Sequence, residues 1–133
     1  MAETYRLDPL GPHSADYTTH VAEALTEAVR VLNHATRASA GVPDPVTVYV
    51  VLGRVTTAIA SLDQLLPQLA DQLVRFNADS RLADDNNDPA LSLANALIHL
   101  DAATAMSTVV ARQLAAAQTA TSGLTLRDGG QGR

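Results

Sequence analysis

The feature that most constrains this chain is a run of apolar residues between Val46 and Phe76 that recur at alternating steps of three and four. In an α-helix this spacing places all of them on one stripe, while polar residues such as Gln64 and Asp71 fall on the other side. The stripe consists of Val48, Leu52, Val55, Ile59, Leu62, Leu66, Leu69, Leu73 and Phe76. The stretch is therefore predicted to be a long helix that buries this stripe.

Two features disturb this helix. Residues 46–52 are rich in β-branched side chains, which are typical of strands, but the stripe continues through them without a change of phase. A lone strand would also have no partner elsewhere in the sequence. Pro67 removes one backbone hydrogen bond, at a cost of roughly 3 kcal/mol, and Gly53 costs roughly 1 kcal/mol relative to alanine. We predict a helix over 46–76 with a kink near Pro67.

Capping signals predict where the helices begin. Ser14, Asp44 and Asp88 each stand where an N-cap side chain belongs, and a proline follows both aspartates at the position preferred in the first helical turn. They predict a first helix over 14–40 and a third over 89–121, on either side of the helix described above. Glycines end the first and third helices. The short connection makes the first two helices antiparallel neighbours.

The segments outside the helices divide the chain into three parts. Residues 1–13 mix charge with prolines and a glycine, and are predicted to form an extended arm tethered by Leu7 and Leu10. Residues 14–122 form the helical bundle domain. Residues 123–133, rich in glycine and charge, are predicted to be a disordered tail.

Composition favours an all-helical core. The 133 residues are 47% hydrophobic but only 3% aromatic, so the core must be built from leucine, valine, isoleucine and alanine. A chain of this length forms one domain and buries roughly two-thirds of its unfolded surface. We predict an all-α fold, an up-down-up bundle of three long helices.

Charge and residue usage limit the partners and the compartment. The formal net charge is −5, and the nine basic residues are scattered arginines, so direct nucleic-acid binding is not expected. The absence of lysine indicates a bacterial source of high GC content. The absence of cysteine fits the cytoplasm. No uninterrupted apolar run approaches the ~20 residues that a membrane span requires, so no membrane contact is expected.

The predicted third helix is apolar on two sides. Leu93, Leu97, Leu100 and Ala111 define one side, and Leu91, Ile98, Val109 and Ala116 define another. Asp101 and Arg112 mark a narrow polar line between the two sides. A helix that is apolar over most of its circumference must be covered on more than one side.

In a bundle of three helices, part of this apolar surface would remain exposed, which predicts a homodimer or a helical protein partner. Dimerisation would extend the fold into a larger bundle, and Ala96, Ala103 and Ala117 would permit close approach of the two chains. The candidate interaction surface consists of Leu91, Ile98, Met106, Val109 and Val110.

No residue pattern identifies a metal site. Asp84, Asn86 and Asp88 have the spacing that opens a calcium loop, but proline and asparagine stand where the loop needs glycine and glutamate. His20 with Glu23, and Asn95 with His99, offer only two ligands each, whereas structural zinc takes four. We predict no bound metal, with these residues as helix caps and surface groups.

No catalytic or cofactor motif is present either. The chain has no G-x-S-x-G nucleophile turn and no phosphate-cradling glycine loop, and it is predicted to be neither an enzyme nor a cofactor protein. Asp101, Thr104, Thr108 and Arg112 are interpreted as a polar seam that fixes helix register.

The predicted function is that of a non-enzymatic protein–protein interaction or scaffolding module of a bacterial cell. One alternative is a small-ligand-binding or enzymatic bundle with a pocket between helices, near Pro67 or at Asp101 and Arg112. A second alternative is a regulatory partner in a DNA-handling complex that acts through protein contacts.

Overall fold

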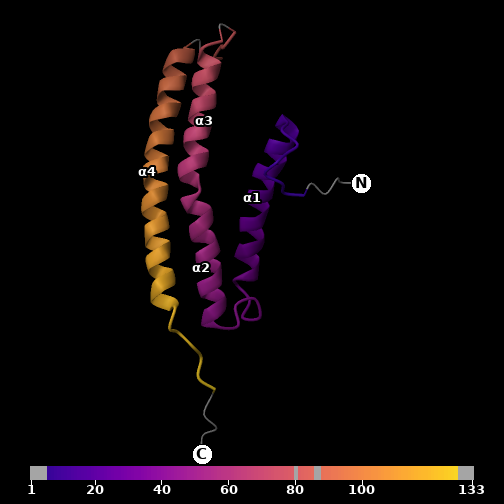
Figure 1. Ribbon diagram of the computed structural model, residues 1–133, viewed down its shortest axis with the longest axis vertical. Coiled ribbons are helices and arrows are strands. Elements are labelled where there is room, and N and C mark those ends of the chain that lie inside the picture. Colours follow the sequence, from indigo (N-terminus) through magenta and orange to yellow (C-terminus); the bar gives the residue numbers. More distant parts are fainter. Residues whose placement is uncertain (1–5, 80, 86–87, 129–133) are drawn as a thin grey trace, which may run out of the picture. The chain divides into compact units, whose positions relative to one another are not determined.

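The computed structural model describes residues 6–79, 81–85 and 88–128, and the regular elements in these residues are all α-helices (Figure 1). The helices are α1 (Ala15–Ala35), α2 (Pro45–Ala60), α3 (Leu62–Asn77) and α4 (Pro89–Thr121). The predicted all-α fold is confirmed, including the β-branched stretch at the start of α2. The third predicted helix has the predicted bounds. The outer parts of the predicted arm and tail, 1–5 and 129–133, lie outside the described residues.

The chain divides into two compact units, Met1–Pro43 with α1 and Asp44–Arg133 with the other three helices. The three helices that pack against one another are α2, α3 and α4. The predicted antiparallel packing of the first helix on the second remains a prediction.

The three predicted N-caps are confirmed. In each, the side-chain oxygen accepts a hydrogen bond from the backbone N–H three residues later, which satisfies a donor that has no partner within the helix. The pairs are Ser14 with Tyr17 at 3.1 Å, Asp44 with Thr47 at 2.8 Å and Asp88 with Leu91 at 3.0 Å. The bond from the Thr47 N–H holds the pKa of Asp44 below its ordinary value of 3.8.

The first helix ends at Ala35, earlier than the predicted residue 40. The Thr36 hydroxyl donates to the carbonyl of Leu32 at 2.8 Å, and the chain leaves the helix there. Gly41 does not cap the helix directly but lies against its last turn, since a Cβ at this position would clash with the Ala35 carbonyl oxygen. Its N–H donates to the Ala38 carbonyl at 2.9 Å and closes the turn.

The described part of the N-terminal arm is held by Tyr17. Its hydroxyl accepts a hydrogen bond from the Asp8 N–H at 2.7 Å and lies 3.0 Å from the Arg6 carbonyl, to which it donates. The Tyr17 side chain is only 8% exposed. The predicted tethers are wrong, because Leu7 and Leu10 are 64% and 86% exposed.

The predicted second helix is interrupted at Ser61, ahead of Pro67, which lies inside α3. Helices α2 and α3 follow each other almost in line (Figure 1). The Ser61 hydroxyl donates to the Thr57 carbonyl at 2.8 Å, and the Gln64 N–H donates to the Ser61 carbonyl at 3.2 Å. The ring of Pro67 crowds the carbonyl of Asp63, so the distortion is relieved in the turn before it.

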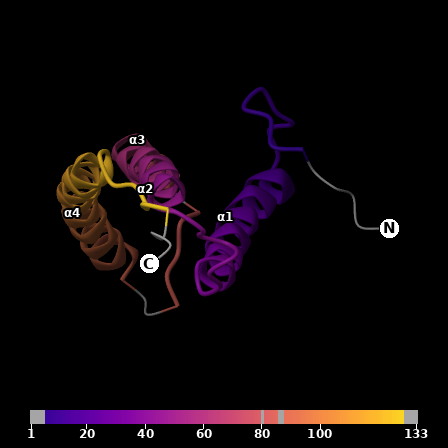
Figure 2. The same cartoon turned by 90° about the horizontal axis from the view of Figure 1, so that it is seen from below.

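Helix α4 runs antiparallel to α2 and α3 and lies alongside both (Figures 1 and 2). Near its C-terminus, the Gln118 side-chain amide donates to the Tyr49 carbonyl of α2 at 3.3 Å. Near its N-terminus, Leu93 lines the same cavity as Leu73 of α3. The α2–α3 segment and α4 therefore form a long hairpin, joined by residues 78–88.

Part of the predicted stripe faces α4. Residues Leu52, Val55, Ile59, Leu62, Leu66 and Leu73 are half-buried. The predicted burial is wrong for three other members of the stripe, since Val48, Leu69 and Phe76 are 37%, 46% and 56% exposed. Contact with a single neighbouring helix covers a narrow seam, and these residues lie at the edge or the ends of it.

Two segments of the described chain, Pro45–Asn77 and Pro89–Thr121, are long and apolar enough to cross a membrane by length and composition alone. Neither segment contains an uninterrupted apolar run of that length, which is why the sequence pattern did not predict them. Charged residues such as Asp63 and Asp101 interrupt the apolar residues of the two segments.

Candidate interaction surface on helix α4

Helix α4 carries two stripes of residues, each with alternating steps of four and three. The inner stripe is half-buried or buried and faces α2 and α3; it consists of Leu93, Leu97, Leu100, Thr104, Ser107, Ala111, Leu114, Gln118 and Thr121. The outer stripe is exposed; it consists of Leu91, Asn95, Ile98, Ala102, Ala105, Val109, Arg112 and Ala116. Each outer residue precedes an inner one by two positions, or about 200° around the helix. The two stripes therefore lie on opposite sides of α4.

The predicted interaction surface lies in the exposed part of α4. Its five members are Leu91, Ile98, Met106, Val109 and Val110, with exposed fractions of 56%, 63%, 67%, 56% and 46%. Leu91, Ile98 and Val109 are members of the outer stripe. Met106 and Val110 are turned about 60° and 100° from it, toward one edge.

Small residues complete the outer stripe. Ala102, Ala105 and Ala116 are exposed between or beyond the larger side chains. The sequence pattern identifies Ala116 as apolar, but the alanines predicted to permit close approach are others. Of those, Ala96 is half-buried on the inner side and lines the cavity next to α3, so it cannot serve an outer contact. The exposed alanines of the outer stripe follow from the steps of four and three that begin at Ile98.

The outer stripe is about as apolar as the inner one. Besides four leucines and one alanine, the inner stripe contains Thr104, Ser107, Gln118 and Thr121. The Thr104 hydroxyl donates to the Leu100 carbonyl at 2.8 Å, and the Ser107 hydroxyl donates to the Thr104 carbonyl at 2.7 Å. The outer stripe has only Asn95 and Arg112 as polar members. Both sides of α4 thus present apolar side chains, although only the inner side packs against α2 and α3.

The predicted polar seam is divided between the two sides. Asp101 and Arg112 are exposed, as is Thr108, whereas Thr104 faces inward as part of the inner stripe. The Thr108 hydroxyl donates to the Thr104 carbonyl at 3.3 Å. The four side chains therefore do not converge on one site.

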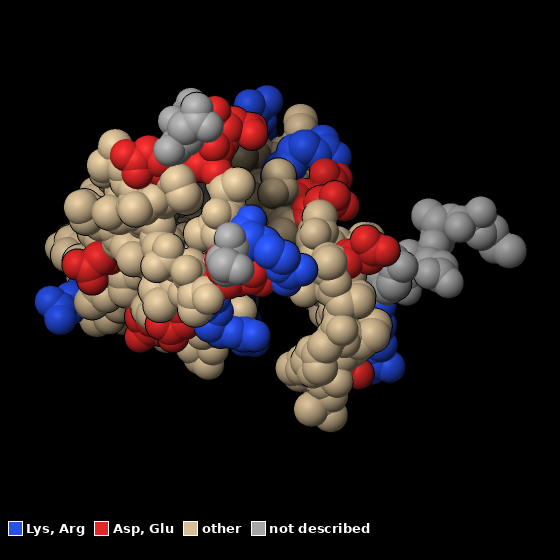
Figure 3. All heavy atoms as spheres, turned by 90° about the horizontal axis from the view of Figure 1, so that it is seen from above, with Lys and Arg blue, Asp and Glu red and all other residues tan. Residues whose placement is uncertain are grey.

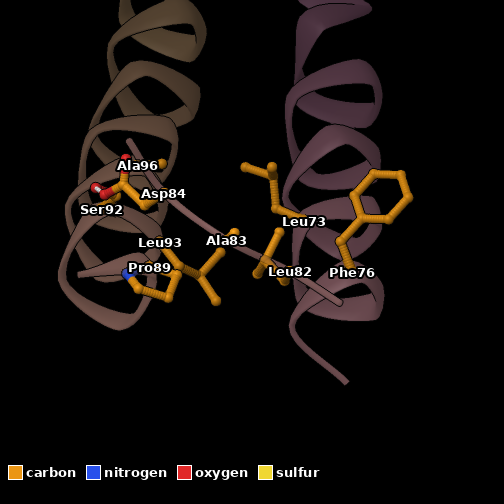
Figure 4. A pocket seen from close by; sticks show the side chains of 9 residues that line it. All are labelled: Leu73, Phe76, Leu82, Ala83, Asp84, Pro89, Ser92, Leu93 and Ala96. Carbon is orange, nitrogen blue, oxygen red and sulfur yellow. Dashed lines mark hydrogen bonds between the residues drawn. The ribbon is translucent and has the colours of Figure 1, made fainter. Parts of the chain in front are cut away.

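A cavity of about 190 Å³ lies where α3, α4 and the segment that joins them meet (Figure 4). It is lined by Leu73, Phe76, Leu82, Ala83, Asp84, Pro89, Ser92, Leu93 and Ala96. Leu73 points toward α4, while the ring of Phe76 points away from it (Figure 4). None of the residues at which a pocket was predicted, Pro67, Asp101 and Arg112, lines this cavity.

The polar groups in this cavity already contact each other. The Ser92 hydroxyl donates a hydrogen bond to the Asp84 carboxylate, which attaches the joining segment to the first turn of α4. Pockets that bind drug-sized ligands have volumes of roughly 300–1,000 Å³, more than this cavity offers. The geometry fits a hydrophobic corner of the hairpin.

Charged side chains are intermixed on the face drawn in Figure 3, where basic and acidic residues lie near one another among uncharged ones. Arg30 pairs with Glu27 at 2.5 Å, and Arg81 pairs with Asp79 at 2.7 Å, in each case between close neighbours in the chain. Both bonds lower the pKa of the carboxylate.

Among the described residues, no three histidine or acidic side chains come together as metal ligands. Asn86, a member of the calcium-loop pattern, lies outside the described residues. Comparisons of the chain with protein-family models, with curated proteins and with solved structures find no match in any of the three. Function is therefore inferred from the helices and their exposed sides.

Proposed function

We propose that this protein is a non-enzymatic helical interaction module, which binds another protein helix along the outer stripe of α4. The observation that carries the proposal is that this exposed stripe is about as apolar as the inner stripe, which packs against α2 and α3. Exposed apolar surface that is continuous along a helix is typical of sites that bind protein partners.

Burial of the stripe by protein accounts for its polar members better than burial in lipid. Every window of 20 residues within α4 includes Asp101 or Arg112. A charge at the centre of a bilayer costs about 2.5–3.5 kcal/mol on the insertion scale. At a protein interface the Arg112 guanidinium can pair with a polar group of the partner, while Asp101, which lies beside the stripe, stays hydrated at the rim. We therefore propose a module of the bacterial cytoplasm.

The residue pair Ala102 and Ala103 offers a matched test. Both are exposed alanines in the middle of α4, but only Ala102 lies on the outer stripe. Ala102→Glu places a charge in the proposed interface, while Ala103→Glu places the same charge about 100° around the helix, away from the outer stripe. Both variants should keep the helical circular dichroism of the wild type.

Binding of an apolar dye and co-purification from the source cells measure the surface directly. The wild type and Ala103→Glu should retain the same co-purifying helical protein or second copy, and Ala102→Glu should lose it. Equal retention by both variants would contradict the proposal. A wild-type protein that is monomeric, binds no dye and retains no partner would contradict it as well.

A further inference from the structure

We infer that the occupant of the outer stripe is a second copy of this chain, with the two α4 helices paired antiparallel about a two-fold axis. This inference rests on the proposed function and names its partner. It is drawn from the order of side chains along the stripe, which is complementary to itself when reversed.

The steps of four and three in the outer stripe fix which residues meet. In an antiparallel pair, a residue reached by a step of three along one helix packs against a residue reached by a step of four along the other. The two-fold axis then repeats every contact once, with the two chains exchanged. One register aligns Leu91 with the partner's Ala116, Asn95 with the partner's Arg112, Ile98 with the partner's Val109, and Ala102 with the partner's Ala105.

Each layer of this register joins residues that suit each other. Ala102 and Ala105 lie beside the two-fold axis. Their small side chains allow a distance between the helix axes near the lower end of the usual 8–10 Å. Leu91 meets a small residue, and Ile98 meets a β-branched one of similar size. The polar residues of the stripe fall into the same layer, where the Asn95 amide oxygen faces a guanidinium donor.

The parallel alternative is disfavoured by the same residues. In a parallel pair each residue meets its own copy, so Arg112 would face the partner's Arg112 inside the interface. The antiparallel register separates these two cations and gives each an amide partner. Arg112 therefore selects the direction of pairing as well as the register.

The length of the stripe favours a copy of α4 over α1. The stripe extends from Leu91 to Ala116, about 40 Å at 1.5 Å per residue, which is between three and four heptads. This is enough for a stable pair of helices. Helix α1 has 21 residues, or about 32 Å, and would leave part of the stripe exposed.

The chain contains no cysteine, so a cross-linking test needs only single additions. Ile98→Cys and Val109→Cys are each purified, mixed, and oxidised. In the proposed register, the thiol introduced at position 98 of one copy lies opposite the thiol introduced at position 109 of the other, within the Cα separation below about 7 Å that a disulfide requires. Two copies of the same variant hold their introduced thiols about 16 Å apart along the axis.

The expected result is a disulfide-linked dimer in the mixture and almost none in either variant alone. Strong cross-linking within each variant alone would mean parallel pairing and would overturn the inference. A helical monomer that binds apolar dye, or that sediments with lipid vesicles, would overturn it too. A monomer that binds the dye would leave the proposed interaction surface in place, with another protein as its partner. A monomer that binds no dye would contradict both the proposed function and this inference.

Discussion

The side-chain amide of Gln118 donates to the backbone carbonyl of Tyr49 at 3.3 Å, which joins the last turns of α4 to the first turns of α2 across 69 residues of sequence. Gly53, one helical turn after Tyr49 in α2, lies next to the Gln118 side chain. A Cβ added there would clash with the Gln118 side-chain nitrogen. The glycine therefore leaves room for a side chain from α4, although it weakens α2 locally.

Gly53→Ala should change stability little in the wild-type background. Alanine gains up to about 1 kcal/mol of helix propensity, but it forces the Gln118 amide aside and gives up a hydrogen bond of about 0.5–1.5 kcal/mol. In a Gln118→Ala background the conflict is absent, so Gly53→Ala should stabilise by about 1 kcal/mol. Urea unfolding of the four proteins measures this coupling, and equal effects of Gly53→Ala in both backgrounds would contradict the account.

The packing of the hairpin predicts different costs for two leucines of the same stripe. Leu62→Ala should cost about 2 kcal/mol, because this half-buried side chain faces α4. Leu69→Ala should cost under about 1 kcal/mol, since Leu69 is 46% exposed. Urea midpoints compare the two, with Gln64→Ala as a surface control that should cost under about 0.5 kcal/mol. A larger cost for Leu69→Ala than for Leu62→Ala would mean that Leu69, and not Leu62, packs against α4.

The cap of α2 should make stability depend on pH. The pKa of Asp44 is lowered in the folded state by the Thr47 N–H and hydroxyl, so its stabilisation is fully present above the ordinary value of 3.8. It is lost as the pH falls through the lowered pKa. Asp44→Asn keeps a cap that does not titrate. Below about pH 4, the unfolding free energy of the wild type should therefore fall relative to that of Asp44→Asn. A constant difference down to about pH 2 would contradict this role.

Tyr17→Phe should release the N-terminal arm. The substitution removes the hydroxyl that accepts from the Asp8 N–H and donates to a backbone carbonyl, at a cost of about 0.5–1.5 kcal/mol. Amide hydrogen exchange at Asp8 should become faster while α4 keeps its protection. Tyr49→Phe is the matched control, because Tyr49 is 38% exposed and makes its hydrogen bond to Gln118 through its backbone. Unchanged exchange at Asp8 would mean that the arm is held by something other than Tyr17.

The starts of α1, α2 and α4 could be predicted from the sequence, because N-capping depends on one side chain and the backbone three residues later. Ser14, Asp44 and Asp88 each make the predicted bond. The end of α1 could not, because Gly41 acts by folding back on the Ala35 carbonyl, a contact that a local pattern does not contain.

The two apolar sides of α4 were predictable from the sequence, but the buried side of α2 and α3 was predictable only in part. The period identified both apolar sides of α4, but it could not decide that Leu69 lies at the edge of the seam, because that depends on how much of the stripe one neighbouring helix covers. The cavity at the end of the hairpin could not be predicted from the helical period, because the segment joining α3 to α4 forms part of it.

The central claim, that the outer stripe of α4 is buried by association, is tested most directly by light scattering after size exclusion. The wild type, Ala102→Glu and Ala103→Glu are measured at the same micromolar concentration. We expect the wild type and Ala103→Glu to have twice the chain mass of 13.9 kDa, and Ala102→Glu to have the chain mass, with a dimer weakened more than about tenfold. The same mass for all three proteins would contradict the claim.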